Sequence, residues 1–532
     1  MPLCSMVASS ADTHTPTHCL DMTFVQVPLI GFLHHANIFS IALTILSLYI
    51  VSLVASRVYN AYLGPFSRFP GPKSRALTVW PLARSTWNGA DNTDVPNLHK
   101  QYGKVVRIAP NQLSFLGDGK TFKDIYGFRH NQTEAKKETR FYARPANRAP
   151  GLFTADGSTH SRQRKIVSHA FSDKALKEQE SMLQLWAKKL RSKLAEQATR
   201  REQTDMLKML NCTTFDIMAD FTFAEPLHML DNSEYVSWVK TIFGGIKFGT
   251  RLRAIRMLGI ISRSALEKIR SYVPSLRKKS MQHLKYITDR IDRRLAKTPD
   301  RPDLWSRILE KGGDPRSTDA GLSLQEHYSI ASLFMVAGTE TTATALSGTM
   351  YYLLKNPEYM IKLQHELRSA FSSIDDMHLD SLARVPFLEA VLKEGIRMYP
   401  PVPIGLPRVS PPGGMTVGEH FVPEGTVVAV HQLSTYRQED NFKHAYEFKP
   451  ERWLGDLEFK DDRLDAFEPF SVGPRNCLGK NLAWHEMRLL LSAVLLHFDV
   501  ELCKESKDWA DQKVYTLWEK PALMCKLTSV KA

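Results

Sequence analysis

The chain has 532 residues, and its 70 Lys and Arg against 56 Asp and Glu give a formal net charge of +14. The basic residues are spread widely, so they favour a solvated helical surface, or a face for an acidic redox partner or anionic lipid, and we expect no nucleic-acid partner. The cysteines show neither metal-type spacing nor a disulfide framework, which fits a reducing compartment; they stand at positions 4, 19, 212, 477, 503 and 525.

The first predicted element is a membrane-spanning helix over residues 38–56. Ile38 to Ala55 carries no charged residue, and a helix of that length spans about 27 Å, close to the hydrocarbon thickness of a bilayer. No Lys or Arg precedes Arg57, whereas four basic residues stand between Arg57 and Arg75, both included. The positive-inside rule therefore places the C-terminal side of this helix in the cytoplasm. This order of charges disfavours a cleaved signal peptide, and a buried core helix is the remaining alternative.

The segments on either side of this helix follow from its orientation. Residues 1–37 would be lumenal, or would reflect an upstream start codon. Residues 57–75 form a basic hinge that contains the stiff breaker Phe69-Pro70-Gly71-Pro72. After residue 75 no composition shift or linker divides the chain, although its length would allow about three domains. Glycosylation sequons at Asn131 and Asn211 would matter only in a lumenal domain.

Two predicted helices further along carry polar pairs on one face. His160 and Arg164 stand four residues apart, and Glu394 and Arg397 stand three apart, so each pair shares a helix face. Alone, such pairs indicate no more than solvated surface residues. Tyr399-Pro400-Pro401 ends the second of these helices.

A long apolar pattern from Ser323 to Leu354 predicts a buried central helix. Within Ala337-Gly338-Thr339-Glu340-Thr341-Thr342, the glycine weakens the helix, and the Thr341 hydroxyl can bond to a carbonyl one turn earlier. A kinked or widened turn there would open a small polar pocket. In such a pocket, Glu340 beside Thr341 has the outline of a proton relay. A Thr-rich turn packed in a core is the alternative.

Cys477 lies in the run Phe470-Ser-Val-Gly473-Pro-Arg475-Asn-Cys477-Leu-Gly479. The two glycines allow backbone conformations and close approaches that a Cβ would block. Phe470 can pack flat against an apolar ring, and Arg475 can pair with an anionic group. A thiolate with backbone N–H groups directed at its sulfur suits an iron ligand. A buried free cysteine in a Gly-rich turn is the alternative, and so many specified residues at fixed spacing argue against it.

This run resembles the haem-binding loop of cytochrome P450, the haem-thiolate monooxygenases, and fills every position of the pattern F-x-x-G-x-R-x-C-x-G. The resemblance implies a mainly α fold with smaller β-sheets (α+β), in one catalytic domain over 76–532 that follows a single N-terminal transmembrane helix. It implies that haem b is bound in this loop, with Phe470, Gly473 and Gly479 around it and Cys477 as the proximal iron ligand. The alternative, several small domains, would separate the matching motifs.

Two further segments resemble the same family. Ala337 to Thr342 matches A/G-G-x-D/E-T-T/S, which implies that Glu340 and Thr341 help to deliver protons during dioxygen activation. Glu394-Gly-Ile-Arg397 and Pro450-Glu-Arg452-Trp resemble the E-x-x-R helix and the P-E-R-W segment. They imply a structural charge network of Glu394, Arg397 and Arg452.

The resemblance also implies which residues bind the haem propionates. Arg164 matches the family's Trp-x-x-x-Arg pattern, in which His160 replaces the tryptophan and can still donate to a carboxylate. Arg408 and Arg475 match two further propionate positions. Charge-assisted pairing of arginine with carboxylate is the physical reason.

Electrons should come from a separate NADPH–cytochrome P450 reductase, because 55 residues after Cys477 leave no room for a fused one. Arg162, Lys165 and Lys480 are candidates for the basic face on which this partner docks.

The substrate is expected to be a lipophilic small molecule. The predicted wall of its pocket is Val402 to Leu406 with Phe334 and Ala337, and the region from Trp238 to Thr250 would form a mobile lid. In its details the sequence is similar to the fungal microsomal members of this family that act in secondary metabolism. That similarity implies hydroxylation or epoxidation, with O2, of a terpenoid, polyketide or alkaloid, by a single-pass protein of the endoplasmic reticulum membrane with its catalytic domain in the cytoplasm.

Two other functions remain open from the sequence. One is a haem-thiolate isomerase or dehydratase, which the Glu340–Thr341 pair disfavours. The other is a non-catalytic, membrane-tethered haem-binding protein, which the same pair disfavours less strongly.

Overall fold

The computed structural model describes residues 38–128, 134–142, 147, 149–259, 265, 274–299, 301–317 and 321–530. The chain divides into two compact units, residues 1–56 and 57–532. The described part of the first unit belongs to helix α1 (Ile38–Tyr62), which extends six residues beyond the predicted end at residue 56. Its segment Ser40–Tyr62 has a mean hydropathy of 2.0 and is a candidate membrane span. Its side chains from Ser40 to Tyr59 are exposed, which argues against the buried core helix.

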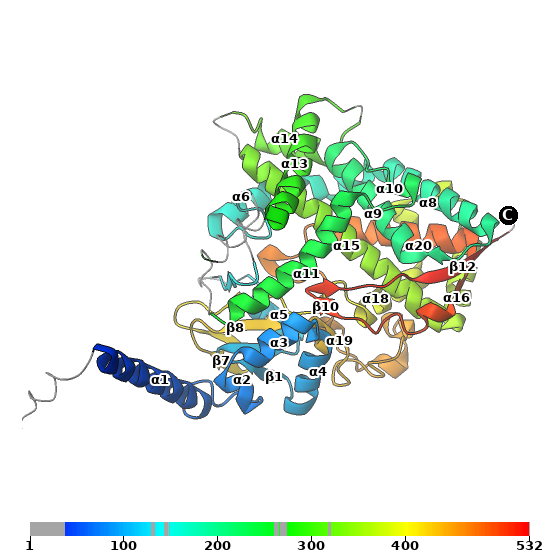
Figure 1. Ribbon diagram of the computed structural model, residues 1–532. Coiled ribbons are helices and arrows are strands. Elements are labelled where there is room, and N and C mark those ends of the chain that lie inside the picture. The colour runs from blue at the N-terminus through cyan, green and yellow to red at the C-terminus, as the bar shows by residue number, and fades with distance from the viewer. Residues whose placement is uncertain are drawn as a thin grey trace, which may run out of the picture. The chain divides into compact units, whose positions relative to one another are not determined.

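The second unit is mainly helical with smaller sheets, as predicted (Figure 1). Its helices include α2 (Lys73–Leu77), α3 (Trp80–Asn88), α4 (Asp91–Tyr102), α5 (Gly119–Tyr126), α6 (Gly157–Val167), α7 (Asp173–Lys177), α8 (Glu180–Arg200), α9 (Met206–Phe223), α10 (Met229–Asn232), α11 (Ser237–Met257), α13 (Pro274–Ala296), α14 (Leu304–Gly312), α15 (Leu324–Lys355), α16 (Pro357–Ala370), α17 (Leu379–Leu382), α18 (Pro386–Met398), α19 (Gln432–Tyr436) and α20 (Lys480–His497).

Small sheets lie at separate places around this helical body (Figure 1). The largest has the strand order β1-β2-β8-β5-β3, and a second has the order β4-β12-β9. β6 pairs with β7, and β10 pairs with β11. Their bounds are β1 (Val105–Ala109), β2 (Gln112–Phe115), β3 (Lys136–Lys137), β4 (Thr204–Asp205), β5 (Arg408–Val409), β6 (Met415–Val417), β7 (His420–Val422), β8 (Val427–Val430), β9 (Phe498–Leu502), β10 (Val514–Tyr515), β11 (Leu517–Trp518) and β12 (Met524–Ser529).

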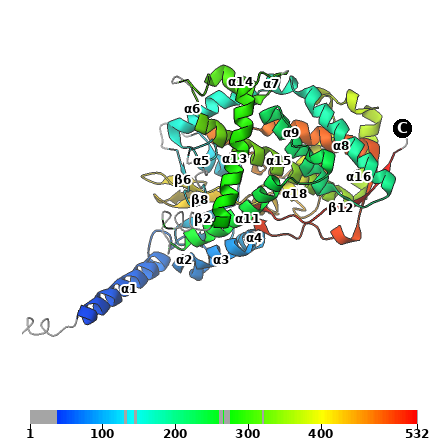
Figure 2. The same ribbon diagram turned by 45° about the horizontal axis from the view of Figure 1, so that its top comes forward.

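Helix α15 is the predicted central helix, and its bounds lie within one residue of the prediction. Its N-terminus is fixed by a capping box in which Ser323 and Glu326 satisfy each other's backbone N–H groups. It packs against α9, α18 and α20, and Figures 1 and 2 show it among these helices. A Cβ at Gly338 would lie 2.7 Å from the sulfur of Met218 on α9, so this glycine permits the close approach of the two helices.

The α-helix of α15 continues without interruption through Gly338. The widened turn expected at this glycine is therefore absent from α15. The predicted back-bond is present: the Thr341 hydroxyl donates to the carbonyl oxygen of Ala337 at 2.6 Å. The glycine therefore serves helix packing, and the threonine satisfies its hydroxyl within an ordinary helical turn.

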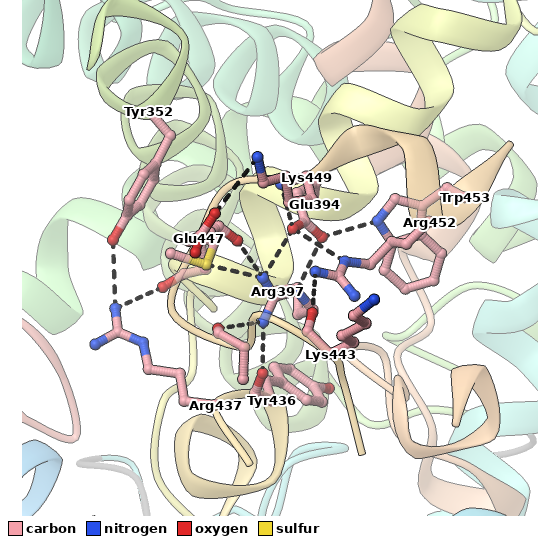
Figure 3. A network of polar contacts seen from close by, with 12 residues as sticks. Tyr352, Glu394, Arg397, Tyr436, Arg437, Lys443, Glu447, Lys449, Arg452 and Trp453 are labelled. Carbon is pink, nitrogen blue, oxygen red and sulfur yellow. Dashed lines mark hydrogen bonds and ion pairs between the residues drawn. The ribbon is translucent and has the colours of Figure 1, made fainter. Parts of the chain in front are cut away.

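The predicted charge network forms where α18 meets the segment 449–453, and Figure 3 shows it from close by. The Glu394 carboxylate accepts two hydrogen bonds of 2.8 Å from the Arg397 guanidinium and one of 3.2 Å from Arg452. Trp453 donates its indole N–H to the same carboxylate at 2.9 Å. The charged side chains of Glu394, Arg397 and Arg452 are fully buried, so each must be paired to be tolerated there.

Arg397 reaches beyond the carboxylate and connects α18 to the end of α19 and to the loop that follows it. Its guanidinium donates to the carbonyl oxygens of Tyr436, Ala445 and Glu447 at 2.6, 2.7 and 2.8 Å. Burial alone would raise the pKa of Glu394, but Arg397 and Arg452 hold that pKa below its usual value. The ionised network therefore stabilises the fold at neutral pH, and its contribution is lost only as the pH falls through the lowered pKa.

Replacing Glu394 by Gln should lower the stability of the folded protein by about 3 kcal/mol, because two buried guanidinium groups lose their counter-charge. The measurement is the midpoint of thermal unfolding, followed by circular dichroism. Glu389→Gln is the matched control on the same helix, since its partly exposed pair with Arg488 should contribute less than about 1 kcal/mol. Equal losses for the two variants would contradict a structural role for the buried network.

Candidate active site

The Cys477 loop is a tight turn that leads into α20. Gly473 has a φ of +78°, and a Cβ there would collide with the carbonyl oxygen of Tyr126 at the end of α5, so the turn requires glycine. The Cys477 N–H donates to the Phe470 carbonyl oxygen at 2.8 Å, which closes the loop. Phe470 packs at a tilt against Trp484, with ring centroids 5.7 Å apart.

Gly479 does not behave as the sequence suggested. Its φ of −88° is open to any residue, and a Cβ there would make an ordinary contact with Phe171 at 3.9 Å. No close approach within the described chain requires glycine at this position.

Cys477 lies just before the N-terminus of α20, where the helix dipole favours an anion. The side chain is accessible, yet the protein surrounds the sulfur closely enough that burial raises the pKa of the thiol. The Gly479 N–H, Arg164 and Lys480 act in the opposite direction. A coordinated metal ion would complete the shift to thiolate.

A group of basic side chains gathers near Cys477. Arg164 donates to the Asn476 carbonyl oxygen at 2.6 Å and to the Asn476 side-chain oxygen at 2.5 Å, so it holds the loop from α6. Arg475 pairs with Glu134 and donates to the Ala155 carbonyl oxygen at 2.6 Å. Both arginines are thus placed beside the thiol, and Arg164 contacts the loop itself.

His160 and Arg408 belong to the same group. His160 is buried, and burial together with Arg475, Lys137 and Arg164 lowers its pKa to about 3, so the imidazole is neutral and can donate one hydrogen bond. Arg408 is also buried, and its Nε and Nη1 atoms have no hydrogen-bond partner within the described part of the chain.

Lys137 is a member of this group that the sequence did not reveal. The β3–β5 register pairs it with Arg408, and its ammonium donates to the carbonyl oxygens of Leu152, Phe153 and Ala155 at 2.7–3.2 Å. Burial, with Arg475 and Arg408 nearby, lowers the pKa of Lys137 to about 7. A strand of two residues leaves no pattern from which this pairing can be read.

These residues fit a haem. The unpaired, buried nitrogens of Arg408 need acceptors, and the neighbouring cations favour an anionic group such as a propionate pair. The accessible thiol at a helix N-terminus suits an axial iron ligand. Binding of haem through the Cys477 thiolate therefore agrees with the donor set that the chain provides.

A cavity of about 630 Å³ that is partly open to the surface lies beside α15. Its lining includes Ala337 and Thr341 of α15, and Val402 and Leu406 of the predicted wall. It also includes residues between Gly245 and Arg256 of α11, the helix that contains the predicted lid region.

Two residues predicted for this wall lie elsewhere. Phe334 packs in the core between Phe171 and Trp305, with ring centroids 5.3 and 6.2 Å away. Ile404 is buried and lines a separate, smaller cavity. In the lid region, Phe243 packs against Phe215 and Tyr235 and is absent from the cavity lining.

Glu340 and Thr341 point in different directions. Thr341 lines the cavity, whereas Glu340 is buried away from it and forms an ion pair with Lys520. The Lys520 ammonium also donates to the Thr344 hydroxyl at 2.7 Å. The Oε2 atom of Glu340 has no hydrogen-bond partner among the described residues. Sequence reasoning missed Lys520, which lies 180 residues further along the chain.

The predicted docking residues are all exposed. Lys480 lies over the ring of Phe470, 6.0 Å from its centroid, and therefore flanks the Cys477 loop. Arg162 pairs with Glu326 at 2.5 Å, so part of its charge is neutralised by the chain itself.

Comparisons with known proteins agree with this geometry. A family model described as cytochrome P450 matches residues 70–525. The chain is 48% identical over 488 residues to the cytochrome P450 monooxygenase efuB of Hormonema carpetanum, with 90% of this chain and 94% of that protein covered. It is 40% identical over 484 residues to the cytochrome P450 monooxygenase FUM2 of Gibberella moniliformis, with 89% and 100% covered. It is 37% identical over 475 residues to the averantin hydroxylase of Dothistroma septosporum, with 88% of each covered.

Replacing Cys477 by His should remove the thiolate signature of the bound haem, because the loop presents one ligating side chain. The measurement is the carbon-monoxide difference spectrum of the dithionite-reduced protein. We expect the Soret band at the thiolate position in the wild type, and either the histidine-ligated position or no haem in the variant. Cys503→Ser is the control at a buried cysteine outside the site. A band that stays at the thiolate position in Cys477→His would contradict this assignment.

Proposed function

Because this chain belongs to the cytochrome P450 family and is a haem monooxygenase, we propose that it hydroxylates or epoxidises a lipophilic small molecule of fungal secondary metabolism. The observation that carries the proposal is the cavity of about 630 Å³, which brings Thr341 together with mostly apolar side chains. Such a cavity suits a terpenoid, a polyketide or an alkaloid.

Bound haem would supply the activation of dioxygen and the insertion of one oxygen atom into a C–H or C=C bond. The Cys477 thiolate would hold the iron, helped by the N-terminus of α20 and by Arg164. His160, Arg164, Arg408 and Arg475, with Lys137, would hold the propionates. Phe470 and Gly473 would keep the Cys477 loop in its conformation, and Gly479 would offer its N–H to the thiolate.

Thr341 and Glu340 would control protons from two faces of α15. The Thr341 hydroxyl, held by Ala337, would offer its oxygen in the cavity to a proton or a water molecule. Glu340 would exchange a proton at Oε2 on the side of α15 that lies outside the cavity. Lys520 would hold the carboxylate in place through its ion pair.

Electrons would come from NADPH through a separate cytochrome P450 reductase. The exposed residues Arg162, Lys165 and Lys480 support a docking face beside the Cys477 loop. An acidic partner would be steered to this face by long-range attraction, which weakens as salt is added.

The membrane arrangement is part of the same proposal. Residues 38–56 would anchor the chain in the endoplasmic reticulum membrane, with residues 1–37 in the lumen. Residues 57–75 would form a basic hinge, and the catalytic domain over 76–532 would lie on the cytoplasmic side. The apolar α1 helix and the basic residues after it support this orientation.

The variant Thr341→Ala should divert electrons from product to peroxide while haem binding survives, because the cavity loses its hydroxyl. The measurement is product formed per NADPH consumed, and we expect a fall of about tenfold. Thr339→Ala is the control, since the Thr339 hydroxyl bonds to Met335 within the same helix and lies outside the cavity. Unchanged coupling in Thr341→Ala would refute the role of this hydroxyl.

Replacing Lys520 by Met should leave the Glu340 carboxylate buried without a cation. We expect coupling to fall, because the buried carboxylate loses the ion pair that holds it in place. Product formed per NADPH consumed is the measurement, and Lys520→Arg should retain most of the wild-type coupling. The control compares the single variant Glu340→Gln with the double variant Glu340→Gln/Lys520→Met. A difference in coupling between these two variants would show that Lys520 does not act through Glu340.

A further inference from the structure

Arg253 is a buried arginine in the wall of the substrate cavity. It lies on α11, has a relative exposure of 7% and lines the cavity. Its guanidinium lies over the ring of Phe141, 4.8 Å from the centroid. The hydrogen bond recorded for it within the described residues runs from Nη1 to the Thr516 hydroxyl at 3.5 Å, which is long for such a contact. Its Nε atom is buried without a partner in the same part of the chain.

Two other buried arginines, Arg397 and Arg294, are much better satisfied. Arg397 binds Glu394 and three carbonyl oxygens. Arg294 forms two hydrogen bonds to the Asp303 carboxylate, at 2.5 and 2.7 Å. A buried guanidinium that lacks acceptors is unfavourable, so the environment of Arg253 is incomplete in a way that the other two are not.

Arg253 nevertheless carries its charge. Burial lowers its pKa to about 10, while Asp91 and Glu138 raise it, so the guanidinium is protonated at neutral pH. These two carboxylates line a second cavity, of about 70 Å³, whose wall also includes Arg253. Neither is a dedicated partner of Arg253, since Asp91 bonds to His431 at 3.3 Å and Glu138 to Arg140 at 2.6 Å.

The rest of the large cavity offers Arg253 no counter-charge. Its described lining contains no Asp or Glu, and a second arginine, Arg256, lies one turn along α11. Thr250 and Thr516 stand beside Arg253, with their hydroxyl oxygens 2.8 Å apart. The cavity is therefore mostly apolar, with one positively charged corner that also carries hydroxyl groups. In an apolar pocket, a small number of such polar groups determines the specificity.

We propose that Arg253 binds an ionised carboxylate of the substrate, so that the substrate class is a lipophilic acid. An N⁺–H···O⁻ pair in a region of low dielectric is short and strong, and Arg is suited to a carboxylate in two-point geometry. The hydroxyls of Thr250 and Thr516 can add at most one further donor, because they bond to each other and Thr250 also bonds to the Ile246 carbonyl oxygen at 3.1 Å. The inference rests on the proposed function, since it assigns a substrate class to the same cavity.

Binding of paired probes tests this assignment without catalysis. Each of several lipophilic carboxylic acids, among them dodecanoic acid, cis-parinaric acid and a triterpenoid acid, is compared with its own methyl ester. The full-length haem-loaded protein is studied in uncharged-lipid nanodiscs. Dissociation constants come from the shift of the Soret band and, independently, from displacement of cis-parinaric acid followed by fluorescence. Because partition into lipid is the same for every variant, the acid-to-ester ratio is compared between variants.

The expected result is a preference of the wild type for at least one acid over its ester, which falls about tenfold or more in Arg253→Met. Arg253→Lys should keep part of the preference, because it keeps the charge without the two-point geometry. Arg251→Met is the matched control: it removes the same charge from the same helix, but Arg251 stacks on Trp87 and Tyr515 and lies outside the cavity lining.

Three results would overturn the inference. One is equal binding of every acid and its ester, or binding of neither, by the wild type. Another is a preference that survives in Arg253→Met or falls equally in Arg251→Met. The last is loss of haem from Arg253→Met, which would assign the arginine to the cofactor. Acid selectivity in a protein that forms no product from any bound acid would count against the proposed function and leave the role of Arg253 standing.

Discussion

The fold holds positive charge where water is largely excluded, and this constraint shapes the site around Cys477. Arg408 is buried, the Lys137 ammonium bonds to backbone carbonyl oxygens, and Arg475 pairs with Glu134. Unpaired buried charge is unfavourable unless an anionic group compensates it. The propionates of a haem have the charge that would compensate Arg408, so we expect the bound cofactor to stabilise the folded protein.

In the Glu394 network, the buried positive charges are compensated without a ligand. Its two arginines meet one carboxylate, an indole N–H and several carbonyl oxygens, so the charges are satisfied by the chain alone. Arg253 is the third case, in which compensation is incomplete on the side that faces the substrate cavity. The three arginine sites thus differ in how far the chain itself satisfies the buried cation.

Much of the site could be predicted from short segments. The turn at Gly473, the back-bond of Thr341 and the pairing of Glu394 with Arg397 depend on residues close in sequence, and all three are confirmed. The roles of the site residues in catalysis and haem binding stay predictions, since they depend on groups that the chain does not supply. Lys520 and Lys137 were beyond reach, because distant strands bring them to the site.

Phe334 shows a different limit. It stands seven residues before Thr341 and so shares roughly its helix face, which made it a reasonable part of the pocket wall. The two residues lie about two turns apart along α15, and at the height of Phe334 that face is covered by Phe171 and Trp305. Helical periodicity gives the direction of a side chain, whereas its surroundings depend on which distant segments pack there.

The close approach of Gly473 to Tyr126 links the two sides of the catalytic centre. The backbone of Tyr126 lies against the turn of the Cys477 loop, while its hydroxyl donates to the Leu406 carbonyl oxygen at 2.9 Å and accepts from the Val430 N–H at 3.1 Å. Leu406 lines the substrate cavity. Tyr126 therefore connects the Cys477 loop to the cavity wall at Leu406. We expect a substitution that displaces Leu406 to disturb the Cys477 loop as well.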